Sequence, residues 1–276
     1  MDTKELQKIA NQIRIDIIEM TYEAQSGHPG GSLSAADILT VLYFHEMRVD
    51  PNNPRWEDRD RLVMSKGHAT PVWYAALAEK GFIPREEIKT FRKINSRLQG
   101  HPNMNDTPGV DMTTGSLGQG LSAANGMAIA GKLDNKDYRV YVILGDGECQ
   151  EGQIWEAAMT AAHYKLDNLT AILDHNGLQI DGPNKDIMNI EPIEDKWKAF
   201  GWHTIRIDGH NIGQIINAIE EAKTTKGKPT IIIADTIKGK GVSFMENQVG
   251  WHGTAPNKEQ MEKAITELKE RGERIG

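Results

Sequence analysis

The stretch RVYVILGDGECQEGQIWEA, residues 139–157, decides the fold class. An apolar run rich in β-branched residues ends at Gly145-Asp146-Gly147, and a helical pattern follows. A carboxylate between two glycines at a strand end is suited to bind a cation, because glycines let the backbone come close to a ligand. A related pattern recurs in LTAILDHNGLQIDG, residues 169–182, where Asn176 follows the next apolar run. The two stretches predict polar groups at the ends of two strands.

Apolar runs alternate with helical patterns through most of the chain. This alternation indicates an α/β fold, with a parallel sheet covered by helices on both faces. No internal repeat or linker interrupts it, so we expect a single domain over residues 1–276. The predicted strands are 62–68, which runs into a loop, 139–144, 169–174, 203–208 and 230–236. The predicted helices are 3–24, 35–47 (opened by Ser34), 70–93 (broken around Gly81 and Pro84), 118–132, 152–165, 191–200, 212–225 and 257–272. Residues 26–32 and 94–115 are predicted loops, and long loops inside compact domains are usually functional.

Composition excludes several classes of protein. The 276 residues are 38% hydrophobic and 26% charged, with 32 basic against 39 acidic residues and a net charge of −7. A mildly acidic chain without a basic run is a poor binder of nucleic acid or anionic membranes. The polar start lacks the apolar core of a signal peptide, and no run approaches the roughly 20 apolar residues of a membrane span. Cys149 is the only cysteine, which fits a reducing compartment. We therefore expect a soluble cytoplasmic protein.

The spacing of the two polar strand ends predicts a metal site. Asn176 follows Asp146 by 30 residues, the length of one strand–helix–strand step. Ligands of open α/β sheets bind beyond the carboxyl ends of the strands, so both side chains are expected at the same edge. Asp146 and the Asn176 side-chain carbonyl suit Mg²⁺, completed by a backbone carbonyl after Asn176 and by phosphate oxygens of a ligand. Taken alone, Gly-Asp-Gly favours a simple turn capped by Asp146.

The sequence resembles a known family. GDGECQEGQIWEA together with LDHNG is similar to the thiamine diphosphate motif, and nearly the whole chain resembles the N-terminal, diphosphate-binding half of transketolases. Further motifs follow in transketolase order: SGHPGGS (26–32), SKGHA (65–69), GHPN (100–103), TTGSLGQGLS (113–122), DGHN (208–211) and WHG (251–253). The resemblance implies the thiamine diphosphate-binding fold, with thiamine diphosphate and Mg²⁺ as cofactors and Ca²⁺ or Mn²⁺ as possible substitutes. It also implies transfer of a two-carbon ketol unit from a ketose phosphate to an aldose phosphate.

The resemblance assigns roles to particular residues. The catalytic set, which would bind donor hydroxyls and help move a proton, is His28, His101 and His252. The cofactor-binding set is His68, Gly115, Ser116, Leu117, Gly147, Glu148, Asn176 and His252, where His68 and His252 would contact the diphosphate. The metal ligands would be Asp146, Asn176 and the backbone carbonyl of Leu178. Family members often have Pro where Ser116 stands.

Several other residues receive structural interpretations. His175 stands where the family has Asp or Asn and is expected to point away from the metal. His210 of DGHN and Cys149 are interpreted as structural. For Glu151 and Glu156, a position near a dimer interface and a solvated helix face remain open alternatives.

The resemblance also implies a partner chain. An intact transketolase is more than twice as long as this chain, and its second domain supplies the glutamate that contacts the aminopyrimidine ring. We expect the N-terminal subunit of a split transketolase, active only with a C-terminal subunit that carries the pyrimidine-binding and last domains. A heterotetramer and self-association are expected, and a cloned fragment is the competing explanation. Sugar-phosphate substrates complete the predicted partners, although the sequence does not identify the sugars.

Two other functions remain as alternatives. The chain resembles, less closely, the corresponding part of a deoxyxylulose-phosphate synthase or of a 2-oxo acid decarboxylating enzyme, and the histidines at 28, 68, 101 and 252 argue against this. A non-catalytic half-domain that only binds a partner is the second, and the presence of Asp146 and Asn176 argues against it. The segment KGKG, residues 238–241, lacks the Walker pattern, and GSLGQG lacks GxGxxG, so a dinucleotide enzyme is not expected.

Overall fold

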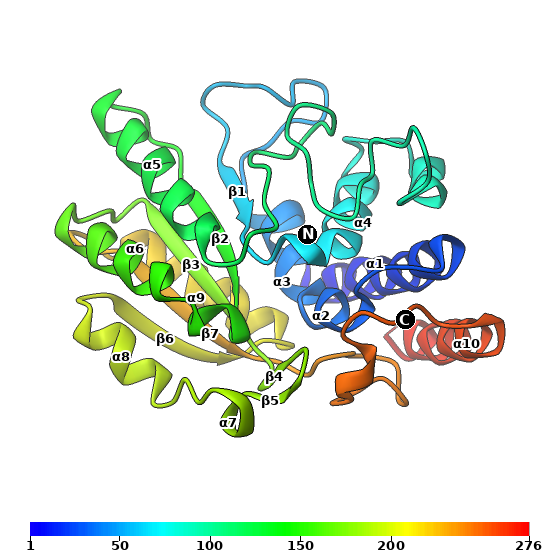
Figure 1. Cartoon of the computed structure of the whole chain (residues 1–276). Coiled ribbons are helices and arrows are strands. Elements are labelled where there is room, and N and C mark those ends of the chain that lie inside the picture. The colour runs from blue at the N-terminus through cyan, green and yellow to red at the C-terminus, as the bar shows by residue number, and fades with distance from the viewer. Residues whose placement is uncertain (276) are drawn as a thin grey trace.

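A computed structural model describes residues 1–275 and contains one five-stranded sheet (Figure 1). All its strands run parallel, in the order β1-β2-β3-β7-β6. The strands are β1 (Arg61–Met64), β2 (Val140–Gly145), β3 (Leu169–His175), β6 (His203–Asp208) and β7 (Thr230–Asp235). Gly145 of β2 pairs with Asp174 of β3, so these two strands end at the same level. The predicted parallel sheet is confirmed.

Helices cover both faces of this sheet. In Figure 1, α5, α6 and α8 lie on one side, and α1, α3 and α4 lie on the other. The helices are α1 (Thr3–Ala24), α2 (Pro29–Ser34), α3 (Ala36–Val41), α4 (Thr70–Lys80), α5 (Gln119–Leu133), α6 (Gly152–His163), α7 (Asn184–Ile187), α8 (Ile193–Ala199), α9 (Ile212–Thr224) and α10 (Lys258–Ile275). A two-stranded hairpin, β4 (Leu178–Gln179) with β5 (Gly182–Pro183), follows β3. Within residues 1–275, no helix combines the length and apolar character needed to cross a membrane.

The alternation of side chains along the strands divides the core into two clusters. Tyr141 and Ile143 of β2 pack into one cluster with α1, α3, α4 and α9. Val142 and Leu144 of the same strand pack into the other with α5, α6 and α8. Successive strand residues point to opposite faces, so a strand buried on both faces must be apolar at every position. This explains the continuous apolar run at 140–144.

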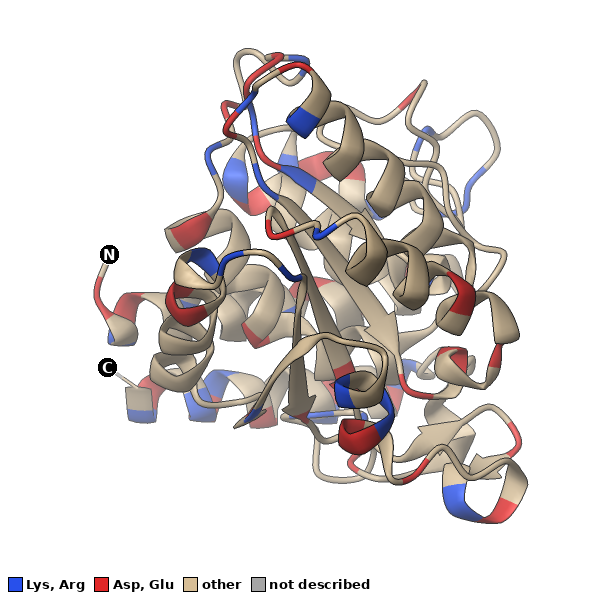
Figure 2. Cartoon of the chain, turned by 90° about the vertical axis from the view of Figure 1, so that its left-hand side faces the viewer, with Lys and Arg blue, Asp and Glu red and all other residues tan. Residues whose placement is uncertain are grey.

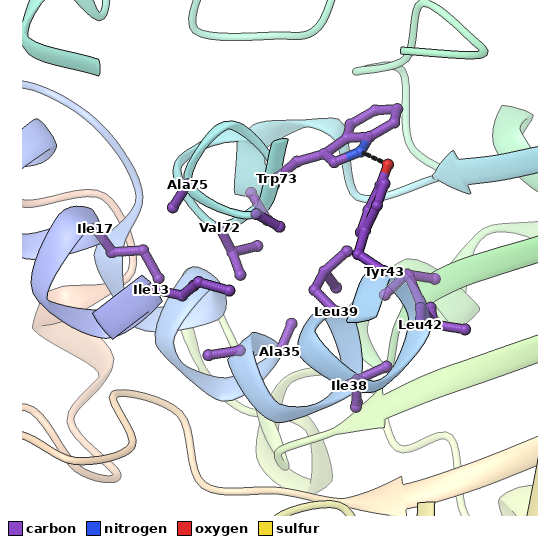
Figure 3. Close-up of a cluster of buried hydrophobic side chains, with 14 of the residues drawn as sticks. Ile13, Ile17, Ala35, Ile38, Leu39, Leu42, Tyr43, Val72, Trp73 and Ala75 are labelled. Carbon is purple, nitrogen blue, oxygen red and sulfur yellow. Dashed lines mark hydrogen bonds between the residues drawn. The ribbon is translucent and has the colours of Figure 1, made fainter. Parts of the chain in front are cut away.

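The larger cluster contains a buried hydrogen bond between two aromatic side chains. Tyr43 and Trp73 are both buried where the segment after α3 meets α4. Figure 3 shows the Trp73 indole nitrogen directed at the Tyr43 hydroxyl, to which it donates at 2.6 Å. A buried indole N–H requires an acceptor, so this bond fixes how the two elements pack.

Two local predictions are wrong. The segment predicted as a loop at 26–32 contains the start of α2 at Pro29, because proline is well tolerated in the first helical turn. Ser34 does not open the next helix: its hydroxyl donates to the Gly31 carbonyl and, at 2.6 Å, to Asp174. By contrast, the predicted break of the helical segment 70–93 around Gly81 and Pro84 is confirmed: α4 ends at Lys80, Gly81 has a positive φ of 95°, and a 3₁₀ turn at Arg85–Thr90 follows.

The start of α5 gives a test of the packing. A Cβ on Gly120 would lie 2.5 Å from the Ser65 Cβ and 2.7 Å from its Cα, whereas a Cβ on Gly126 of the same helix would meet no atom within 4 Å. Gly120→Ala should lower the free energy of unfolding by about 1–3 kcal/mol through overpacking. Gly126→Ala should leave it unchanged or raise it by up to about 1 kcal/mol through helix propensity. Urea unfolding of both variants at one protein concentration decides, and equal effects would contradict the predicted close contact.

Candidate functional site

A cavity of about 360 Å³ opens at the carboxyl edge of the sheet. Its walls come from the segments that follow β1, β2, β3 and β7, together with residues near α2 and in the loops at 100–117 and 250–253. Every predicted site residue except Ser116 lines it, and Ser116 is exposed beside Gly115. A larger cavity, about 450 Å³, lies between residues 54–59 and 104–111 and contains none of the predicted residues.

Asp146 lies at the floor of the cavity, where β2 ends. The residue is 2% exposed, and its carboxylate accepts hydrogen bonds from the backbone N–H groups of Gly147, at 2.7 Å, and Gly177. The second bond joins the ends of β2 and β3, as the spacing of Asp146 and Asn176 predicts. Burial raises the pKa of Asp146, and the nearby charge of Asp174 raises it further. A bound cation would relieve both effects.

Asn176 and Leu178 line the same cavity and flank Gly177, whose N–H bonds to Asp146. The side-chain oxygen of Asn176 accepts from the Leu178 N–H at 3.1 Å. The Leu178 carbonyl accepts from the Lys238 ammonium at 3.2 Å. Within residues 1–275, no cluster of three or more His, Cys, Asp or Glu side chains is placed to hold a metal ion. One carboxylate, one amide and one backbone carbonyl leave most of the coordination of Mg²⁺ to a ligand.

A buried ion pair between Lys66 and Asp174 lies near Asp146. The carboxylate of Asp174, fully buried on β3, accepts hydrogen bonds from the Lys66 ammonium and the Ser34 and Thr236 hydroxyls. Lys66, 2% exposed, also donates to the Gly31 carbonyl at 2.8 Å. The charge of Lys66 and these bonds hold the pKa of Asp174 below its ordinary value despite burial.

A second buried lysine faces the cavity from the segment after β7. Lys238 is 3% exposed, and its ammonium lies 2.8 Å from Nδ1 of His252. Burial lowers the pKa of Lys238 to about 8, against the opposing attraction of Asp146. An ammonium that retains a charge in so dry a position is suited to bind an anion.

Three of the predicted histidines form a cluster above these charges. The ring centroids of His28 and His68 are 5.0 Å apart, those of His68 and His252 5.2 Å, and those of His28 and His252 5.4 Å. Burial lowers the pKa of His28 to about 4 and that of His252 to about 3, and it holds the pKa of His68 well below 6.5. All three are therefore neutral near pH 7. Nδ1 of His28 is buried without a hydrogen-bond partner among the described residues, which leaves it available to a ligand.

The fourth predicted histidine, His101, lies at the exposed rim. A Cβ on Gly115 would lie 2.7 Å from its imidazole, and Gly115 has a φ of 151°. Only glycine fits this backbone beside this ring. Leu117 follows with its side chain 37% exposed at the mouth of the cavity.

Glu148 has a structural role beside the cofactor-binding one that its motif implies. Its buried carboxylate accepts from the Ser65 hydroxyl, from the Gly118 N–H at 2.9 Å and from the Gly145 N–H at 3.0 Å. These bonds tie the ends of β1 and β2 to the start of α5. The side chain therefore shapes the wall of the cavity that it also lines.

The three residues interpreted as structural, His175, His210 and Cys149, lie outside the cavity. His175 points to the Asp235 and Glu191 carboxylates, at 2.8 and 2.9 Å. His210 is bonded between Asp37 and the Ile237 N–H. Cys149 is buried and burial raises the pKa of its thiol, so it acts as a packing residue. Glu151 and Glu156 are both exposed, and Glu151 also lines the cavity.

The motifs of the sequence do not single out Lys66, Lys238 or Asp174. Lys66 and Lys238 each precede a glycine just beyond a strand end, in SKGH and in KGKG. That position is the signal that could have found them, because they share it with Asp146. Asp174 lies two residues before Asn176, inside an apolar run, and nothing in that pattern distinguishes it.

The donor set of the cavity fits thiamine diphosphate and a divalent cation. Asp146, Asn176 and the Leu178 carbonyl would hold the cation, while Lys238 and the His68 ring would face phosphate oxygens. The partnerless Nδ1 of His28 marks a place for a polar group of a ligand. A diphosphate supplies the oxygen ligands that the cation still needs. The cation in turn balances the negative charge of the diphosphate, which one free lysine cannot balance alone.

Comparisons with known proteins agree with this geometry. Residues 5–271 match the family model described as "Transketolase, thiamine diphosphate binding domain". The 6-deoxy-6-sulfo-D-fructose transketolase subunit SqwG of Clostridium sp. (strain MSTE9) is 50% identical over 268 residues, 97% of this chain and 98% of the relative. An apulose-4-phosphate transketolase subunit of Phocaeicola vulgatus is 46% identical over 275 residues, 100% of this chain and 97% of the relative.

Full-length transketolases match over less than half of their own length. Human transketolase is 46% identical over 264 residues, 95% of this chain but 42% of the human protein. The crystal structure of transketolase from Campylobacter jejuni superposes with a TM-score of 0.92 at 38% identity, covering 99% of this chain and 43% of that one. This chain belongs to the transketolase family, in which it corresponds to the thiamine diphosphate-binding domain.

Proposed function

We propose that this chain is the diphosphate-binding subunit of a two-chain transketolase that requires thiamine diphosphate and Mg²⁺. The observation that carries the proposal is the meeting of Asp146, the Asn176–Leu178 segment and Lys238 on one cavity floor, beneath neutral histidines. The floor suits a cation and a diphosphate, and the histidines suit the hydroxyls of a sugar. The match to relatives that are themselves subunits, over nearly their whole length, supports the two-chain arrangement.

The proposed work of this chain is to bind, orient and move protons. When bound, thiamine diphosphate would supply a carbanion that attacks a ketose carbonyl and carries the two-carbon unit. The metal ligands and the diphosphate contacts would be those described above for the cavity floor. His28, His101 and His252 would bind donor hydroxyls, and a neutral imidazole can accept a hydroxyl proton and return it.

A partner chain would close the cavity. The exposed apolar side chains of Leu117 and Ile180 lie at its mouth, and Ile187 and Met188 of the neighbouring segment are 45% and 60% exposed. Exposed apolar groups beside an incomplete site are typical of an interface. We propose that the C-terminal subunit covers them and brings the carboxylic acid that contacts the aminopyrimidine ring.

A second surface fits self-association. Figure 2 faces the side of the molecule that carries α5, α6 and α8, and there α5 and α6 carry few charged residues, whereas α8 carries several. Leu133, Met159 and Tyr164 are more than half exposed there, at 75%, 57% and 58%. Two copies joined through this face, each with one partner chain, would give the proposed heterotetramer with closed symmetry.

The names of the two related subunits guide our proposal for the substrates. The names of the two subunit relatives state a sulfonated deoxyfructose and apulose 4-phosphate. We propose a ketose donor and an aldose acceptor that each carry an anionic group, a phosphate in the simplest case. The groups that bind that anion are expected on the partner chain.

The metal assignment predicts that cation and cofactor bind together. Asp146→Asn keeps the size of the side chain and one acceptor for the backbone N–H groups, but it removes the charge. In the assembled enzyme it should abolish measurable thiamine diphosphate binding in the presence of Mg²⁺, because a diphosphate would then meet too little positive charge. Calorimetry measures this, with Asp181→Asn, an exposed carboxylate on the following hairpin, as the control. Unchanged affinity in Asp146→Asn would rule out the metal assignment.

The low pKa of His28 predicts a pH dependence of stability. The unfolded ring has a pKa near 6.5 and the folded ring about 4. Between these values the unfolded chain binds more protons, so stability falls as the pH falls from about 6.5 towards 4. The slope from one such group is at most about 1.4 kcal/mol per pH unit and is reduced here by solvent screening.

The measurement compares wild type with His28→Asn in urea unfolding. The variant lacks the titrating ring, so it should lose less stability than wild type between pH 7 and pH 5. Parallel losses in the two proteins would contradict the prediction. An NMR titration of the wild-type ring should give a midpoint near 4.

The two-chain arrangement predicts that this chain alone is inactive. With Mg²⁺, thiamine diphosphate, a ketose phosphate and an aldose phosphate it should form no product, because the acid that activates the aminopyrimidine ring belongs to the partner. Addition of the partner chain should restore turnover and raise cofactor affinity. Turnover at a normal enzymatic rate by the purified chain alone would refute the arrangement.

A further inference from the structure

We infer that Arg14, Asp37 and His210 are positioning residues that hold segment 237–240 so that Lys238 faces the cavity. None of the three lines the cavity. They come from α1, α3 and the turn between β6 and α9, which are far apart in the sequence. The inference rests on the proposed function, because it concerns how Lys238 is presented to an anionic ligand.

The first arm of the arrangement runs through Arg14. Its guanidinium forms a fork with Asp37, with Nη1 donating to Oδ1 at 3.1 Å and Nη2 to Oδ2 at 2.6 Å. Arg14 is 1% exposed and Asp37 4%. The remaining Nε–H donates to the Lys240 carbonyl at 3.2 Å. The planar guanidinium thus joins a buried carboxylate to one end of the segment.

The second arm runs through His210. Its Nε2 accepts from the backbone N–H of Ile237 at 2.9 Å, so the ring proton must lie on Nδ1. Nδ1 then donates to Oδ2 of Asp37 at 2.8 Å. The same carboxylate therefore fixes the other end of the segment, through a histidine whose tautomer is set by its two partners.

Between these two ends, the backbone of the segment is bonded to its surroundings. The Gly239 N–H donates to the Gly30 carbonyl at 3.0 Å, and the Lys238 carbonyl accepts from the Asn247 N–H at 2.9 Å. A lysine side chain has a flexible stem and ordinarily extends its ammonium into water. Here the backbone is held at both ends, and the ammonium lies beside the Leu178 carbonyl and the His252 ring.

A negative charge at Asp37 is what both arms require. The Arg14 charge and the bonds from Arg14 and His210 hold the pKa of this carboxyl well below its ordinary value despite complete burial. If one partner were removed, this buried carboxylate would be left partly unsatisfied, and the arrangement around it would have to change. The two ends of the segment are therefore coupled through one residue.

The test uses the assembled enzyme and measures the affinity for thiamine diphosphate with Mg²⁺ by calorimetry. Lys238→Met should weaken binding by about tenfold or more, because the loss of a ligand-binding group, or of a residue that supports one, typically has an effect of this size. His210→Leu, which removes one arm, should weaken it in the same direction. His210→Gln, whose amide has both a donor and an acceptor, should recover part of the loss. His203→Leu is the control, because His203 bonds to Glu221 at the amino end of β6.

The double variant separates positioning from general damage to the fold. If His210 acts through Lys238, His210→Leu should cost no further affinity once Lys238→Met is present. If His210→Leu does not fold, Arg14→Lys takes its place, since it keeps a positive charge beside Asp37 but withdraws the bond to Lys240. Additive losses, or wild-type affinity in His210→Leu while Lys238→Met is impaired, would overturn the inference alone. An absence of cofactor binding by the wild-type enzyme would overturn the proposed function and, with it, the inference.

Discussion

The carboxylate of Asp174 is the constraint on which the site depends. It is fully buried at the end of β3 and accepts from Lys66, Ser34 and Thr236, which follow β1, end α2 and follow β7. A buried carboxylate that loses its hydrogen-bond partners strongly destabilises the folded protein. The three segments that supply these partners are therefore held together. The central strands are apolar on both faces, which confines polar groups to the strand ends. The architecture that excludes charge from the core thus gathers it at one edge of the sheet.

The fold follows the sequence well wherever one period dominates. The apolar runs at 139–144, 169–174 and 230–236 form strands within a residue of their predicted bounds. The helix end at Gly81 was predictable, because glycine readily adopts the positive φ that ends a helix. Prediction failed where glycine and proline allow several structures, as at Pro29–Ser34 and at the start of the helix that follows. Those outcomes depend on tertiary packing, which no local pattern contains.

The site was predictable in part for a similar reason. Asp146 and Asn176 could be paired because one strand–helix–strand step sets their spacing, and the Asp146–Gly177 bond joins the two strand ends. Lys66 and Lys238 are 172 residues apart in the chain (238 − 66), a distance that no spacing rule spans. Only the order of the strands, β1-β2-β3-β7, brings their ammonium groups to one cavity. Motif comparison pointed to the histidines, but not to the burial that keeps three of them neutral.

The balance of charge in the cavity explains why a cation and an anion belong together there. Lys66 is already matched by Asp174, the Glu148 carboxylate accepts three hydrogen bonds from the protein, and Glu151 is exposed to water. Among the buried charged groups that line the cavity, Asp146 and Lys238 are therefore left to face a ligand. The clustered histidines add no positive charge near neutral pH, because burial holds their pKa values low. A divalent cation alone would meet one carboxylate and few other ligands, and a diphosphate alone would meet one free ammonium beside a carboxylate. Each lacks what the other supplies, and in a buried site such a deficit is costly because water cannot screen it. The cavity is therefore suited to the pair, and its open mouth leaves the rest of the ligand to be covered from outside.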